Sequence, residues 1–346
     1  MKRRVGCLDG SGRGVCQEME LPELTPGQVL VEVKASLISP GTELGGAKRQ
    51  RESPNSQQAP RPFGYASAGI AAALGEGVSQ YRVGQPLACM GGGYALHTDW
   101  TCVPQNLCVP LPAGVSFEEG AFAHLAATAL HAIRRTQPVF GENGMVMGLG
   151  LVGQLCAQFG QLSGAHMMGV DRFPMRLELA LRCGLEQVVN PAGEDPVAQA
   201  QAWTGGYGLD FGLIAFGGEA TQAFDQIYAS LKRAPDTHRM GRIVIVGGAR
   251  IDRAFAAALG NVDVRSAART GPGYHDEGYE HGRDYPPVFV EWSTQRNLAE
   301  SLRAIAAGRL QVQPLITHRL ELARIGQAVD LLVEEPQNAL GVILNP

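Results

Sequence analysis

The sequence lacks the features that mark several classes of protein. None of its seven cysteines stands in a Cys-x-x-Cys pair, which argues against a disulfide framework and against a four-cysteine zinc site. No apolar run approaches the roughly 20 residues of a membrane span, and no apolar core of signal-peptide length follows the basic start at residues 1–10. The net charge of −4 gives no electrostatic reason to expect a nucleic acid or an anionic membrane as a partner. We therefore expect a cytoplasmic protein whose thiols are reduced and buried.

The pattern of elements divides the chain in two, because one hydrophobic core seldom serves a chain of 346 residues. Up to about residue 115 the sequence is strand-like and irregular, as in the alternating run at 27–36. Ser116 and Glu119 then form a capping-box pattern before a small-residue helix, which we place at 116–135. From there strands and helices alternate, which predicts an α/β fold with a doubly wound parallel sheet.

The alternation breaks at residues 270–287. This segment is polar and aromatic with several glycines and prolines, which predicts a long loop. Two interpretations stay open, a substrate-facing loop or lid and a plain surface excursion. A helix at 294–308 follows, and a final strand–helix–strand tail returns the chain to the first domain.

Three glycines predict a dinucleotide site. Gly148, Gly150 and Gly153 have the Gly-x-Gly-x-x-Gly spacing, follow a buried strand and open a helix. The first glycine permits the tight turn, the second lets a pyrophosphate approach the backbone, and the third lets helix and strand pack closely. The helix N-terminus supplies free N–H groups and the positive end of a dipole.

Asp171 ends the second strand of this pattern, where a carboxylate would accept hydrogen bonds from the adenosine ribose. It would repel a 2′-phosphate, so NAD is favoured over NADP. Arg172 and Arg176 weaken that preference, because a nearby guanidinium can hold the extra phosphate. The alternative is that Asp171 merely caps the helix that follows.

Together these features resemble the medium-chain dehydrogenase/reductase superfamily, the relatives of zinc alcohol and polyol dehydrogenases. The resemblance covers nearly the whole chain, and its marks lie at residues 26–43, 62–85, 129–135, 148–153 and 314–318. It implies a GroES-like β-barrel catalytic domain at 1–125, completed by 310–346, and a Rossmann domain at 126–309. The cofactor is expected in the cleft between the domains, and relatives are usually homodimers or homotetramers.

The chain departs from the zinc-bearing relatives at the metal positions. The resemblance places a cysteine where this chain has Pro40, a histidine where it has Tyr65, and a cysteine or glutamate where it has His124. A catalytic zinc needs about three protein ligands, and the cysteines of a structural zinc loop are missing between residues 88 and 104. We therefore expect metal-free chemistry with no zinc.

The same positions supply the candidate catalytic residues. By resemblance, the Thr42 hydroxyl touches the substrate oxygen and relays its proton, while Tyr65 and His124 face the same cavity and can donate to a developing alkoxide. Glu43 is expected to orient His124 or Tyr65, or to bind a substrate hydroxyl. Structural roles remain open for each, as turn, packing and helix residues, and His97 is interpreted as structural.

The predicted function is a zinc-independent, NAD-dependent oxidoreductase acting on a secondary alcohol or ketone. The loop at 270–287 suits a small hydroxyl-rich substrate, such as a polyol, cyclitol or sugar derivative. The alternatives are an NADPH-dependent enone or quinone reductase and a non-catalytic NAD-binding protein. The motif and the resemblance together predict these cofactor-binding residues: Thr128, Gly148, Gly150, Leu151, Val152, Gly153, Asp171, Arg172, Arg176, Phe216, Gly217, Val246 and Gly247.

Overall fold

The computed structural model describes the whole chain, residues 1–346, which divides into two compact units. Unit 1 comprises Met1–Ala127 and Thr270–Pro346, and unit 2 comprises Thr128–Arg269. The sequence assigned 270–309 to the dinucleotide-binding domain, whereas the structure groups this segment with unit 1. No helix is both long and apolar enough to cross a membrane.

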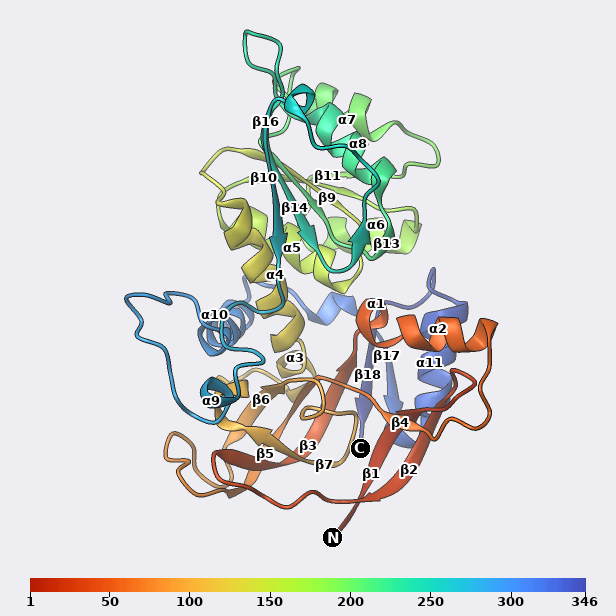
Figure 1. Ribbon diagram of the computed structural model, residues 1–346, viewed down its shortest axis with the longest axis vertical. Coiled ribbons are helices and arrows are strands. Elements are labelled where there is room, and N and C mark those ends of the chain that lie inside the picture. The colour runs from red at the N-terminus through yellow and green to blue at the C-terminus, as the bar shows by residue number, and fades with distance from the viewer. The chain divides into compact units, whose positions relative to one another are not determined.

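Unit 1 is built around strands (Figure 1). A seven-stranded sheet has the order β17-β18-β3-β5-β6-β8, with β7 paired to β3, and a three-stranded sheet has the order β2-β1-β4. All pairs are antiparallel except β17 with β18. Its strands are β1 (Lys2–Leu8), β2 (Gly14–Glu20), β3 (Gln28–Ile38), β4 (Arg61–Pro62), β5 (Ala66–Leu74), β6 (Pro86–Met90), β7 (Trp100–Pro104), β8 (Cys108–Pro110), β17 (Ile316–Glu321) and β18 (Gly341–Asn345).

Short helices connect and cover these strands. The amphipathic α11 buries Ile325, Ala328, Val329 and Leu332 in a core that also takes Ile38 and Leu344 from two strands. The helices of this unit are α1 (Pro40–Glu43), α2 (Gly45–Glu52), η1 (Gln105–Leu107), α3 (Phe117–Gly120), α9 (Glu277–Glu280), α10 (Thr294–Ala306), η3 (Gln313–Leu315), η4 (Leu322–Arg324) and α11 (Ile325–Glu334).

Unit 2 has the predicted doubly wound architecture (Figure 1). The six strands of its main sheet are all parallel, in the order β11-β10-β9-β12-β14-β16, and β13 pairs with β15 in a separate parallel pair. The order reverses between β9 and β12, so the chain winds first to one side and then to the other. The elements are β9 (Asn143–Met147), α5 (Leu151–Leu162), β10 (His166–Val170), α6 (Pro174–Arg182), β11 (Gln187–Val189), α7 (Pro196–Trp203), β12 (Phe211–Ile214), β13 (Gly218–Glu219), α8 (Thr221–Ser230), β14 (Met240–Val246), β15 (Ala249–Arg250), η2 (Ala257–Leu259) and β16 (Asn261–Ala267).

The helix predicted at 116–135 is two helices. Ser116 and Glu119 form the expected capping box at the start of α3, but α3 ends at Gly120 and α4 runs from Ala123 to Thr136. A Cβ at Gly120 would lie 2.5 Å from the Leu111 side chain. The close packing of α3 on its neighbours is a tertiary constraint that helical periodicity does not reveal.

Candidate active site

The glycine turn of unit 2 has the geometry of a phosphate-binding loop. Gly148 has φ of +91°, a conformation that favours glycine. A Cβ at Gly153 would lie 1.8 Å from the Gly148 carbonyl oxygen, so only glycine permits this approach of α5 to the turn. Gly150 is the N-cap of α5, and a Cβ there would meet no atom within 4 Å. The Leu151 and Val152 amides in the first helical turn therefore border open space suited to an anion.

The other predicted cofactor residues of the sheet lie at its same edge. Phe216 and Gly217 follow β12, while Val246 ends β14 and Gly247 follows it with φ of +96°. Since β9, β12 and β14 are parallel neighbours, their carboxyl ends share one edge, which is where ligands bind in sheets of this kind. The side chain of Phe216 lies beside Gly148, 2.9 Å from where a Cβ would stand.

Asp171 is buried and tied to the glycine turn. One carboxylate oxygen accepts from the Leu149 N–H at 2.8 Å, and the other accepts from the Phe173 N–H at 2.9 Å. The N-cap of α6 is Phe173, so Asp171 does not occupy the capping position considered above. Arg176 approaches the carboxylate at 3.6 Å, and the guanidinium groups of Arg172 and Arg176 lie 4.7 and 4.6 Å from the Phe173 ring centroid. Acceptor and cationic groups thus stand together at the predicted ribose position.

In unit 1, the structure brings Tyr65 together with two hydroxyl side chains. Burial raises the pKa of Tyr65 well above its ordinary value, and the Glu43 carboxylate raises it further. Hydrogen bonds with the side chains of Ser39 and Thr42 oppose that rise. Ser39 is buried at the start of α1, whereas Thr42 within α1 is exposed. Tyr65 is therefore a neutral phenol at physiological pH, with a short hydroxyl chain leading to the surface.

Glu43 points inward, toward a residue that the sequence analysis treated as structural. Its carboxylate accepts from the Ser39 N–H and lies 3.3 Å from Nε2 of His97, with both side chains almost fully buried. Nδ1 of His97 is 2.9 Å from the Ser36 hydroxyl oxygen. The carboxylate thus meets His97 directly and acts on Tyr65 through its charge.

His124 is buried on α4 against Tyr65. Its Nδ1 lies 2.8 Å from the Tyr65 carbonyl oxygen, and because a carbonyl only accepts, Nδ1 carries the proton. Burial lowers the pKa of His124 to about 4, so the ring is neutral at pH 7 and Nε2 is its acceptor nitrogen. The two rings pack with centroids 4.4 Å apart. Thr128 follows one turn later on α4 and is half-buried.

The residues at the metal positions of zinc-bearing relatives do not fit a catalytic zinc. Pro40 has no side-chain donor atom and Tyr65 holds a proton, so of the three positions only Nε2 of His124 could ligate a metal, whereas a catalytic zinc needs about three protein ligands. Across residues 1–346 no group of three or more His, Cys, Asp or Glu side chains is placed to hold a metal ion. All seven cysteines are free, and six of them are buried.

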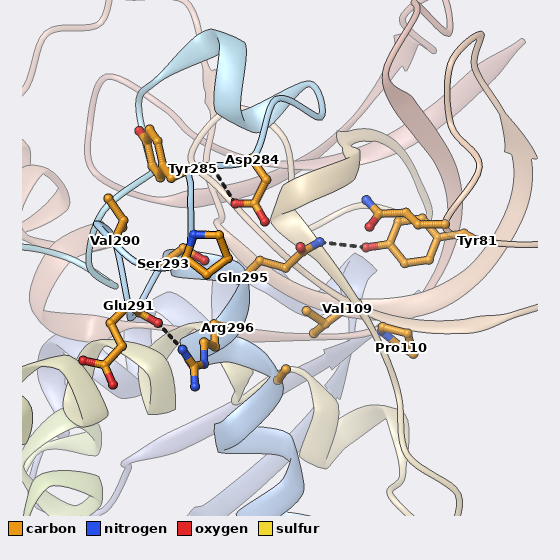
Figure 2. A pocket seen from close by; sticks show the side chains of 13 residues that line it. Tyr81, Val109, Pro110, Asp284, Tyr285, Val290, Glu291, Ser293, Gln295 and Arg296 are labelled. Atoms are coloured by element: carbon orange, nitrogen blue, oxygen red, sulfur yellow. Dashed lines mark hydrogen bonds between the residues drawn. The ribbon is translucent and has the colours of Figure 1, made fainter.

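A separate hollow in unit 1 contains none of these residues. Figure 2 shows this pocket of about 330 Å³, in which Tyr81 and Val109 of the barrel face Tyr285, Gln295 and Arg296. The amide of Gln295 donates to the Tyr81 hydroxyl at 3.1 Å. The contact fixes the start of α10 to the barrel.

Sequence reasoning did not single out Ser39, His97 or Tyr274 as site residues. Ser39 directly precedes the Pro-Gly-Thr-Glu motif, so its position was a usable signal. Tyr274 lies in the loop identified as substrate-facing or surface, and its ring centroid is 6.0 Å from that of His124. Neither His97 nor Tyr274 is marked by any local pattern.

Known proteins resemble the chain in both sequence and fold. The family model of zinc-binding dehydrogenases matches residues 152–275. The 2-dehydro-3-deoxy-L-galactonate 5-dehydrogenase of Pseudoalteromonas atlantica is 25% identical over 82% of each chain, and the L-threonine 3-dehydrogenase of Rhizobium etli is 25% identical over 88% of each. The crystal structure of 2R,3R-butanediol dehydrogenase from Bacillus subtilis matches with a TM-score of 0.76 and 20% identity over 99% of each chain. With the geometry above, these matches make the chain similar in sequence and fold to medium-chain dehydrogenases/reductases, and they support an oxidoreductase of the alcohol dehydrogenase type.

Proposed function

We propose that the protein is an NAD-dependent dehydrogenase that interconverts a secondary alcohol and a ketone without zinc. The observation that carries this proposal is the group at the former metal positions, where a protonated Tyr65 with Ser39 and Thr42 adjoins a neutral His124. A hydrogen-bond donor such as the Tyr65 hydroxyl can polarise a carbonyl in place of a Lewis acid.

The cofactor would be held by unit 2. The glycine turn and the start of α5 suit the pyrophosphate, and Asp171 suits the adenosine ribose. Phe216, Gly217, Val246 and Gly247 border the path toward the nicotinamide. When bound, the nicotinamide supplies the hydride acceptor or donor.

The protein's own residues would move the proton. In the direction of ketone reduction, the Tyr65 hydroxyl donates to the substrate oxygen and transfers its proton as the oxygen becomes an alkoxide, a stronger base than phenolate. Thr42 and Ser39 then return a proton to Tyr65 from the surface. His124 accepts a hydrogen bond through Nε2 from a neighbouring substrate hydroxyl, and its low pKa keeps it neutral while it does so.

The substrate is proposed to be a small, hydroxyl-rich molecule of the polyol, cyclitol or sugar class. Two observations support this class. The relatives named above include a dehydrogenase of a deoxy sugar acid, and the acceptor nitrogen of His124 favours a second hydroxyl beside the reacting carbon. By analogy with relatives, we also propose a homodimer or homotetramer, which light scattering would test.

A second candidate is an NADPH-dependent enone or quinone reductase. It is favoured by Arg172 and Arg176, whose guanidinium groups lie beside Asp171 and would suit a 2′-phosphate. The negative charge of Asp171 argues against this candidate, because it would repel the 2′-phosphate of NADPH.

The test compares NADH with NADPH, and reduction of C=O with reduction of C=C, in one assay. Purified protein is given NADH or NADPH with cyclohexanone, 2-cyclohexen-1-one, ketoses and inosose, and products are identified by mass and NMR. The proposal predicts carbonyl reduction with NADH preferred. Reduction of only the C=C bond with NADPH would favour the second candidate. Cofactor binding without turnover of any substrate would favour a non-catalytic NAD-binding protein.

A further inference from the structure

Tyr274 joins the cluster of Tyr65 and His124 from the far end of the sequence. Its ring meets that of His124 edge-on, with centroids 6.0 Å apart and planes at 85°. Its hydroxyl oxygen accepts from the Gly92 N–H at 2.7 Å. The neighbouring Gly91 N–H donates to the Tyr65 carbonyl at 3.0 Å, so one glycine turn holds both tyrosines.

The backbone around Tyr274 is in conformations that need support. Gly271 and Gly273 have φ of +101° and +109°, and the non-glycine His275 has φ of +74°. The His275 amide donates to the Glu280 carboxylate at 2.7 Å, and its ring stacks on Tyr274 with centroids 3.9 Å apart. A non-glycine residue in this region is costly and persists where its surroundings hold it. The left-handed turn therefore sets where the Tyr274 ring points.

The segment that carries Tyr274 is anchored to the barrel. Tyr279 is fully buried, and its carbonyl accepts from the Asn106 side chain at 2.7 Å. The Gln105 side chain donates to the His281 carbonyl at 2.9 Å. Farther along, Gln295 donates into the wall of the pocket in Figure 2. Of the two interpretations of this loop, the anchored arrangement favours a fixed substrate-facing wall over a loose excursion.

We infer that Tyr274 is the residue that limits substrate size in this enzyme, an inference that rests on the proposed function. Tyr274 is half-buried, so part of the residue packs against His124 and part is accessible. Because its ring is stacked on His275 and packed edge-on against His124, the ring is held in place when a larger substrate binds. A substrate bound at Tyr65 and His124 therefore contacts the ring of Tyr274, which stays in a fixed position.

The experiment measures how kcat/KM depends on substrate size in two variants. Linear 2-ketones of three to eight carbons, cyclohexanone and inosose are each assayed with NADH. Tyr274→Ala removes the wall and is expected to raise kcat/KM for the largest accepted ketones, relative to the smallest, by about 10-fold or more, since each methylene in a pocket is worth about 10-fold or more in discrimination. Tyr274→Phe keeps the ring and is expected to keep the wild-type size profile.

The control is Tyr285→Phe, which removes a hydroxyl from the same loop where it bonds Asp276. It should leave the size profile unchanged, and thermal unfolding of each variant checks that the loop remains folded. An unchanged profile in folded Tyr274→Ala would overturn the inference, as would an equal shift in Tyr285→Phe. Absence of turnover by the wild type across the whole panel would instead count against the proposed function. If Tyr274→Ala does not fold, Tyr274→Leu replaces it, with the same expected shift in the same direction.

Discussion

Replacing Tyr65 by phenylalanine removes one oxygen atom and leaves the ring that packs on His124. In the proposed mechanism this hydroxyl donates the proton, so its loss should lower kcat by about 10²-fold, the lower end of the range for a proton-transfer group. That factor corresponds to about 2.7 kcal/mol in the activation free energy. KM should change little, because the ring and the Tyr65 carbonyl that binds His124 both remain.

Steady-state kinetics with NADH and the best ketone of the panel would measure this effect. The free energy of unfolding should fall by about 1 kcal/mol, because water can replace the lost partner of the exposed Thr42 but not that of the buried Ser39. Tyr94→Phe is the matched control, since it removes a hydroxyl from a nearby tyrosine that the mechanism does not use. If Tyr65→Phe keeps full kcat, the assignment of the proton donor is refuted, and if both variants lose activity equally, the effect is not specific to Tyr65.

Three further predictions follow from the structure. Gly153→Ala places a Cβ 1.8 Å from the Gly148 carbonyl oxygen and should lower the free energy of unfolding, measured by urea titration, by about 3 kcal/mol. Gly150→Ala should fold normally but weaken NADH binding, measured by calorimetry. Equal losses of stability in the two variants would contradict the different roles given to these glycines. The pKa of His124 falls from 6.5 to about 4 on folding, so as the pH is lowered the unfolded chain binds the proton first. The free energy of unfolding should therefore fall by up to about 3 kcal/mol between pH 6.5 and pH 4. His124→Asn should remove that part of the pH dependence, and a variant that keeps the wild-type slope would argue against a neutral, buried ring. Asp171→Asn keeps an acceptor but removes the negative charge. The value of kcat/KM with NADPH, divided by the value with NADH, should therefore rise about 10-fold. An unchanged ratio would mean that Asp171 does not set cofactor preference.

The parts of the fold that the sequence predicts are those with local causes. Gly148 and Gly153 are required by a turn and by one close backbone approach, and both requirements appear as spacing in the sequence. Ser116 and Glu119 signal their capping box in the same way. Strand and helix periodicity likewise predicted the parallel sheet, because each element buries its own face.

The remaining features of the site depend on contacts between segments that are far apart in the sequence. Nothing in the sequence near Glu43 indicates that its carboxylate faces His97, and nothing near Tyr274 indicates that its ring reaches His124. The close packing of Gly120, at the end of α3, on the side chain of Leu111 is likewise a contact that helical periodicity does not reveal. Such contacts are set by tertiary structure, so the sequence alone does not predict the hydroxyl and aromatic surroundings of the site.

The most direct test of the central claim is the zinc content of active enzyme. Protein purified without added metal would be measured by elemental mass spectrometry and assayed for NADH-dependent ketone reduction before and after treatment with a chelator. Chemistry without zinc predicts far less than one zinc per chain and a kcat that the chelator does not change. One tightly held zinc per chain, whose removal abolishes turnover and whose return restores it, would show that the enzyme uses a catalytic zinc.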